Sequence, residues 1–146
     1  MAPASPVSAM DANASPVSPS VAAPVSSPAA AAEAVLDAEK MAVYRVALDL
    51  QELASGLVPA QQRVSHDQME RASLSTVLCV AEGCGRRSKR DKRRFYTMAR
   101  GSATETAAIV DVLLRRRLAP EAACRSARSL ALRVVQMLTK LDAALS

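Results

Sequence analysis

The segment KRDKRRFYTMARGSATETAAIVDVLLRRR, residues 89–117, is the longest helical pattern in this chain of 146 residues. Apolar and small side chains recur in it at steps of three and four, the spacing of one face of an α-helix. Ser88 precedes the segment and Asp91 follows three residues later, a capping-box pattern that predicts a helix beginning at Lys89. The predicted inner stripe comprises Phe95, Met98, Ala99, Ser102, Thr106, Ile109, Val112 and Leu113.

A second helical pattern precedes this segment. It is predicted to run from Ser65 or Asp67 to Glu82, where Gly83 suits the left-handed residue that follows many helices. Apolar residues occupy more than one side of it, which indicates burial by its own bundle and by a neighbouring subunit. They are Met69, Ala72 and Thr76 on one side, and Leu74, Val77, Leu78 and Ala81 on another.

Two further patterns complete the fold prediction. One runs from Val43 to Leu57 and is stopped by Pro59, and the last opens at Pro120, a good first-turn residue. No segment shows the alternation of a β-strand. Four helices with short loops and one apolar stripe each predict an all-α, antiparallel up-down four-helix bundle over residues 33–146. The stripe of the last helix is Ala127, Leu130, Ala131, Val134, Leu138, Leu141 and Leu145.

The first 32 residues differ in composition from the rest. They are almost entirely Ala, Pro, Ser and Val, with Asp11 as the only charged side chain, so residues 1–32 are predicted to be a disordered tail. This tail lacks the basic start of a signal peptide, and no apolar run is long enough to cross a membrane. The odd number of cysteines shows no disulfide pattern, which favours a reducing, cytoplasmic location. The three are Cys79, Cys84 and Cys124.

Positive charge is concentrated where the third helix begins. All 19 Lys and Arg residues follow residue 39, and Arg86–Arg94 holds seven of them. A helix N-terminus is electropositive, so bases there lower stability and indicate an anionic partner. Lys89, Arg93 and Arg100 fall within about 40° of one another at about 100° per residue, which predicts a ridge on the outer face. The predicted nucleic-acid-binding residues are Arg86, Arg87, Lys89, Arg90, Lys92, Arg93, Arg94 and Arg100.

Two other interpretations of this basic segment stay open. One is a solvated charge run that only keeps the protein soluble, and the other is a docking surface for an acidic protein. If the ligand is nucleic acid, binding is expected to be electrostatic with weak sequence preference. Phe95 is predicted to point inward, which leaves Tyr96 as the only nearby ring for stacking on bases.

Three short motifs carry a family resemblance: RASLS at residues 71–75, AEG at residues 81–83 and FYTMARGSATE at residues 95–105. Over about residues 41–142 the chain resembles the four-helix-bundle proteins encoded in intervening sequences of large-subunit ribosomal RNA genes. That family includes the accessory variability determinants of diversity-generating retroelements. The resemblance implies a ring, typically of five subunits, that binds RNA or DNA without enzymatic activity. In the retroelement branch it also implies a reverse transcriptase partner.

The motif residues are interpreted as structural. Gly101 lies among small residues where another backbone can approach, and Glu105 can pair with Arg71 as a polar latch or, alternatively, serve as a catalytic carboxylate. The family pattern has Asn where this chain has Cys79 and Ile where it has Thr76, so the hydrogen bonding of that amide is not transferred. The structural motif comprises Arg71, Ser75, Glu82, Gly83, Gly101, Ser102 and Glu105.

A small hydrolase would have only Glu82, Glu105 and Cys84 to use, so the sequence predicts no enzyme, and it predicts no metal or cofactor either. His66 with Cys79 and Cys84 matches no zinc spacing, and Gly83 and Gly85 follow a predicted helix, whereas a phosphate-binding glycine loop follows a strand. Cys79 and Cys124 are expected to be small core residues. Cys84 lies beside arginines and is either a reactive thiol or an ordinary loop cysteine.

Overall fold

A computed structural model describes residues 1–4 and 36–146, and most of the predicted tail lies outside these ranges. The described residues contain no strand. They form a short 3₁₀ helix, η1 (Asp37–Lys40), followed by α1 (Ala42–Ser55), α2 (Arg63–Gly85), α3 (Lys89–Arg116) and α4 (Glu121–Ala144). These elements confirm the all-α class and the predicted four-helix bundle.

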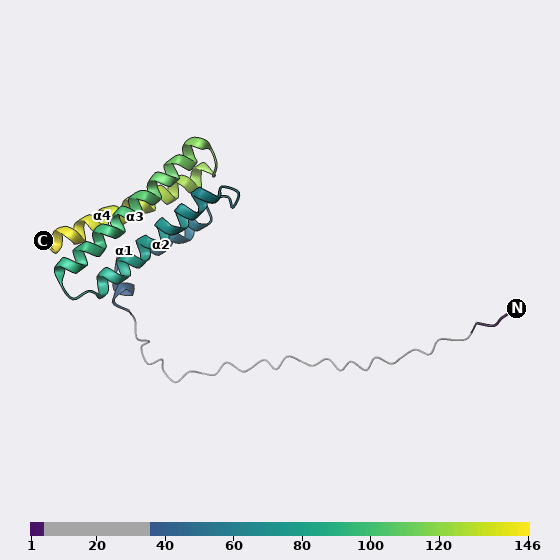
Figure 1. The fold of residues 1–146 in the computed structure, drawn as a ribbon, viewed down its shortest axis with the longest axis horizontal. Helices are drawn as coiled ribbons and strands as arrows, with labels where there is room; N and C mark the ends of the chain where they lie inside the picture. Colours follow the sequence, from purple (N-terminus) through teal and green to yellow (C-terminus); the bar gives the residue numbers. More distant parts are fainter. Residues whose placement is uncertain (5–35) are drawn as a thin grey trace, which may run out of the picture. The chain divides into compact units, whose positions relative to one another are not determined.

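Successive helices run in opposite directions, and α4 returns to pack against both α3 and α1 (Figure 1). The bundle is therefore closed, with every helix touching two neighbours. The C-terminus and the α2–α3 connection lie at the same end (Figure 1). This topology brings the basic start of α3 beside the last turn of α4.

Small side chains dominate the centre of the bundle. Fully buried alanines line the contacts between the helices, and leucines and valines fill the remaining space, as the sparse aromatic content predicts. Buried hydroxyls bond to carbonyls one turn back in their own helix, Ser73 to Met69 at 2.7 Å and Thr76 to Ala72 at 2.9 Å. The fully buried alanines are Ala47, Ala54, Ala72, Ala99, Ala103, Ala127 and Ala131.

Several helix ends differ from the predictions. α1 ends at Ser55, four residues before Pro59, because the buried loop residues Leu57 and Val58 already turn the chain into the core. α2 begins at Arg63, earlier than predicted. Pro120 is the N-cap residue of α4 and not part of its first turn.

Gly83 does not end α2, contrary to the prediction. It is a buried helical residue without a positive φ, and α2 continues to Gly85. A Cβ at Gly83 would lie 2.8 Å from Cε1 of Tyr96 and 2.9 Å from Cβ of Phe95. Glycine is needed here because α3 approaches the α2 backbone too closely for any side chain.

The face of α3 that is buried in the structure is rotated about the helix axis relative to the predicted one. Met98 and Val112 are 46% and 48% exposed, whereas Tyr96 is only 4% exposed. α3 packs against α2 on one side and α4 on the other, so its buried face is centred between them. The buried residues of α3 are Tyr96, Ala99, Ala103, Thr106, Val110 and Leu113.

Replacing Gly83 by Ala should destabilise the bundle by about 1–3 kcal/mol, because the added methyl group overpacks the contact with Tyr96 and Phe95. Gly101→Ala is the matched control, since nothing lies within 4 Å of its Cβ position. It should raise stability by about 0.5–1 kcal/mol through helix propensity. Urea unfolding followed by circular dichroism measures both, and equal effects would contradict the close approach.

Candidate nucleic-acid interface

The basic segment begins at the end of α2 and continues into the first turns of α3. The Oγ of Ser88 accepts a hydrogen bond from the backbone N–H of Asp91 at 3.1 Å, which confirms the predicted N-cap. The Nζ of Lys92 donates to the carbonyl of Cys84 at 2.7 Å. A cation at this position satisfies a terminal carbonyl and complements the negative end of α2. Lys92 thus stabilises the loop and is not a free cation.

Arg93 and Arg100 face α4 instead of the predicted outer surface, and Lys89 lies on the same side of α3 as Arg93. Arg93 holds Asp142 of α4 at two points, Nε to Oδ1 at 2.9 Å and Nη2 to Oδ2 at 3.3 Å. Nη1 of Arg100 lies 3.5 Å from the hydroxyl of Thr139, which is also on α4. Both arginines face the α3–α4 seam because the burial of Tyr96 rotates them toward it.

Phe95 does not point inward as predicted. It is half-buried, and the guanidinium of Arg86 lies over its ring with a Cζ-to-centroid distance of 4.6 Å. Arg94 approaches the same ring at 6.0 Å. Arg86 also forms an ion pair with Glu82, so it is held by both charge and stacking.

Five cations of the segment are exposed, and Arg86 is one of them. The other four are Arg87, Lys89, Arg90 and Arg94. Within residues 36–146 none of these four forms an ion pair. They surround the start of α3, whose unpaired N–H groups add positive potential. This exposed group is the candidate interface, and we call it the basic end of the bundle.

The family motif lies along the α2–α3 seam. Arg71 and Glu105 form the predicted ion pair, and Arg71 also donates to Gln68. The hydroxyls of Ser75 and Ser102 are 2.9 Å apart. These contacts join α2 to α3, which supports the latch interpretation of Glu105 over the catalytic one.

Cys79 and Gly101 complete the motif. The thiol of Cys79, at the position of the family's Asn, lies 3.8 Å from the Ser75 hydroxyl, a weak contact in place of an amide hydrogen bond. Gly101 is exposed, whereas Ala99 and Ala103 point into the core. The predicted small-residue patch therefore does not form within one bundle.

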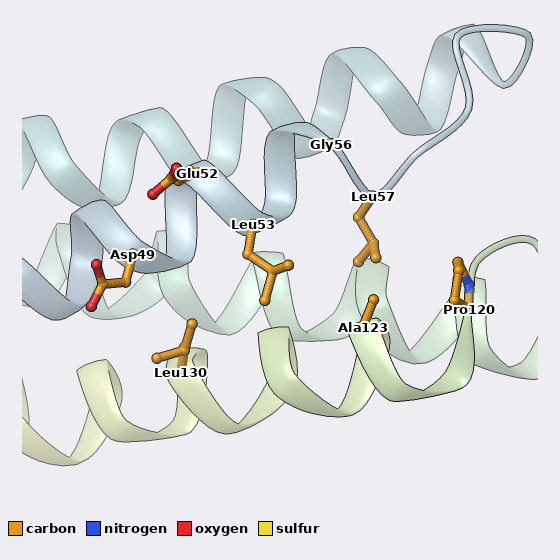
Figure 2. Close-up of a pocket in the computed structure, with 8 residues that line it drawn as sticks. All are labelled: Asp49, Glu52, Leu53, Gly56, Leu57, Pro120, Ala123 and Leu130. Carbon is orange, nitrogen blue, oxygen red and sulfur yellow. The ribbon is translucent and has the colours of Figure 1, made fainter.

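A separate hollow of about 540 Å³ lies between α1 and α4, far along the bundle from the basic end. Leu53 and Leu57 point across it toward Ala123 and Leu130 (Figure 2). Its only charged lining residues are Asp49 and Glu52. The part of the chain that the structure describes holds no group of three His, Cys, Asp or Glu residues able to bind a metal.

Cys79 and Cys124 are both buried, as predicted for small core residues. Burial raises the pKa of the Cys124 thiol, with a smaller contribution from the carboxylate of Glu121. The Cys124 thiol therefore stays protonated in the core and behaves as a small apolar residue. Cys84 is half-buried.

Comparison with known proteins agrees with the motif. The family model described as "23S rRNA-intervening sequence protein" matches residues 39–140, which span α1 to α3 and most of α4. The chain belongs to this family. No curated protein matches the sequence. No helix in the described part of this 23S rRNA-intervening sequence protein combines the length and apolar character needed to span a membrane.

Asp142 of this family member was not among the residues predicted to matter for the site. An acid in the last turn of a helix opposes the helix dipole, as the bases at the start of α3 do. In an antiparallel bundle these two unfavourable ends meet, so each charge finds its counterion in the other helix. The position of Asp142 within α4 was the signal that would have identified the Arg93–Asp142 pair.

Asp142 should make the bundle acid-sensitive. The hydrogen bond from Arg93 lowers the pKa of the Asp142 carboxyl below its ordinary value. Its contribution to stability is therefore present above the unfolded pKa of about 4 and is lost as pH falls through the lower folded pKa. Asp142→Asn should be less stable than wild type at pH 7, and the gap should close in acid. Urea unfolding over a pH series measures this, and a gap independent of pH would contradict it.

Proposed function

We propose that this protein is a non-enzymatic nucleic-acid-binding protein that contacts the phosphate backbone of RNA or DNA with the basic end of its bundle. The observation that carries the proposal is the set of four exposed, unpaired cations at the start of α3. Arg71 and Arg128, by contrast, have carboxylate partners on a neighbouring helix. Other exposed cations without an ion pair, such as Arg63 and Arg133, are present in the described residues, but the basic end gathers four of them within residues 87–94. Backbone phosphates are the partner that a group of free cations fits best.

The location of these cations favours a ligand over simple solubility. Arg115 and Arg116 lie in the last turn of α3, where the helix dipole stabilises positive charge. Lys89 and Arg90 lie in the first turn, where the same dipole opposes it by about 0.3–1 kcal/mol each. An anion bound at the basic end would remove this penalty.

The few aromatic residues favour backbone contact over base recognition. Tyr96 is buried, and the ring of Phe95 is already covered by Arg86. Neither of the two rings of α3 is therefore free for stacking on unpaired bases. Affinity should therefore depend strongly on salt and weakly on sequence.

The proposal includes assembly into a homo-oligomeric ring. Leu74 and Leu78 of α2 are 47% and 56% exposed, and Met98 of α3 is also exposed. The Ser75–Ser102 contact sets the register of the two helices, so Leu78 and Met98 lie at the same level. A second copy of the chain would cover this apolar surface, as the second face of α2 predicts. A ring of five, with a reverse transcriptase partner, is what the retroelement branch of the family implies.

Replacing Arg87, Lys89, Arg90 and Arg94 together by Gln should weaken the binding of oligonucleotides by a similar factor whatever their sequence. Each lost phosphate contact lowers the salt slope by about 1, so the slope of log affinity against log salt should fall by about 4 per engaged subunit. Fluorescence anisotropy with unrelated oligonucleotides between about 50 and 200 mM salt measures the slope.

The matched control replaces four other exposed arginines by Gln and so removes the same charge: Arg63, Arg115, Arg116 and Arg133. This variant should keep the wild-type slope. If both variants lose affinity equally, only net charge matters and the basic end is not the interface. If the wild-type protein fails to bind the oligonucleotides at low salt, the nucleic-acid proposal is rejected in favour of the alternative, in which the basic end binds an acidic protein.

The double variant Leu78→Glu with Met98→Glu should dissociate the ring, because two carboxylates would be buried in the subunit contact. Light scattering should give about five chains for wild type and one for the variant. The control is Leu48→Glu with Leu132→Glu, two apolar residues of comparable exposure on α1 and α4. A monomeric wild type, or dissociation by the control pair alone, would exclude this surface as the contact.

A further inference from the structure

The basic end contains a hollow as well as a charged surface. A depression of about 400 Å³ lies between the first turns of α3 and the last turn of α4. Four cations and one hydroxyl line it from α3, and one carboxylate and one leucine line it from α4. The lining residues are Lys89, Arg90, Arg93, Arg94, Thr97, Asp142 and Leu145.

The cations in this hollow already hold an anion. Arg93 binds the carboxylate of Asp142 through two nitrogens, the geometry with which arginine also binds phosphate. Lys89, Arg90 and Arg94 line the same space and have no carboxylate partner within residues 36–146. With four cations and one carboxylate, the hollow keeps a net charge of +3.

A second Arg–Asp pair between the same two helices shows that the pair alone does not make such a site. Arg128 of α4 donates to Asp111 of α3, with Nε and Oδ1 2.9 Å apart. The smaller hollow beside Arg128 is lined by alanines, Leu132, Val135 and Thr104, with no further cation. Of these two cross-helix pairs, the one at the basic end is the one surrounded by unpaired positive charge.

We propose that the hollow binds a phosphate monoester, and that Asp142 occupies the phosphate's position on Arg93 until the ligand displaces it. This inference deepens the proposed function and rests on it, because it assigns the end of a nucleic acid to the hollow. The phosphate would accept hydrogen bonds from Arg93 and Thr97, with Lys89, Arg90 and Arg94 around it. The positive end of the α3 dipole adds to the attraction.

The charge of the hollow favours a monoester over an internal diester. A terminal phosphate carries about −1.5 to −2 at pH 7 and has three free oxygens, whereas a backbone diester carries one charge. Asp142 and Leu145 line the α4 side of the hollow. The net charge of +3 in the hollow is therefore balanced better by a terminal phosphate than by a diester.

The first experiment compares one single-stranded DNA oligonucleotide with a 5′-phosphate and the same oligonucleotide with a 5′-hydroxyl, each bound to the full chain. Wild type should bind the phosphorylated form more tightly. Asp142→Asn should increase affinity for that form by about 10- to 30-fold, the effect of removing one unit charge about 4 Å from a phosphate that carries about −1.5 to −2, in bulk water. Arg93→Gln should abolish the preference for the phosphorylated end.

Asp111→Asn is the matched control, since it breaks the other cross-helix pair and changes the net charge equally. It should leave the preference for the phosphorylated end unchanged. Calorimetric titration with inorganic phosphate distinguishes the two sources of the ligand. Phosphate binding that Asp142→Asn strengthens, without any preference between the oligonucleotides, would support the hollow as a site for free phosphate compounds.

The inference is overturned if wild type and Asp142→Asn bind both oligonucleotides equally and neither binds inorganic phosphate. It is also overturned if Asp111→Asn and Asp142→Asn have the same effect. In both cases salt-dependent binding of the oligonucleotides would leave the proposed function standing. If the protein binds inorganic phosphate but neither oligonucleotide, the proposed function is rejected and the hollow is still a phosphate-binding site.

Discussion

The close approach of α3 to the α2 backbone at Gly83 determines how the basic residues are presented. The ring of Tyr96 lies against Gly83, where any side chain would clash, and this contact sets the rotation of α3 about its axis. Arg93 consequently faces α4, while Arg90 and Arg94 remain exposed. A helix rotated as the sequence suggested would present different cations to a ligand. The chemistry of the basic end therefore depends on a contact between two uncharged residues.

The helices were predictable from local information, and the rotation of α3 was not. Periodicity, the Ser88 cap and the turn residues are properties of neighbouring positions, so they predicted four helices and the start of α3. Phe95 and Tyr96 are adjacent aromatic residues with similar apolar area, and local periodicity favours the wrong one. The deciding factor is Gly83 on another helix. The same glycine resembles a helix cap when only its neighbours in sequence are considered.

The basic segment was recognisable from its composition, but the partners of its cations were not. Lys92 caps the carbonyl of Cys84 across a turn, and Arg93 pairs with Asp142, which is 49 residues away in sequence. Tertiary pairing thus divides one charge run into structural and free cations. Without a ligand, Lys92 and Arg93 hold neighbouring elements together, and the cations around the first turn of α3 have no carboxylate partner in the described residues. Arg93 becomes available to a ligand only when Asp142 is displaced.

The alanine-lined core has a thermodynamic consequence. An alanine exposes far less apolar surface on unfolding than a leucine, and apolar exposure is what raises the heat capacity of the unfolded chain. A bundle whose helix contacts are lined by residues such as Ala99, Ala103 and Ala131 therefore unfolds with a modest heat-capacity increment. Its free energy of unfolding follows a shallow curve with temperature, so cooling and moderate warming change it little.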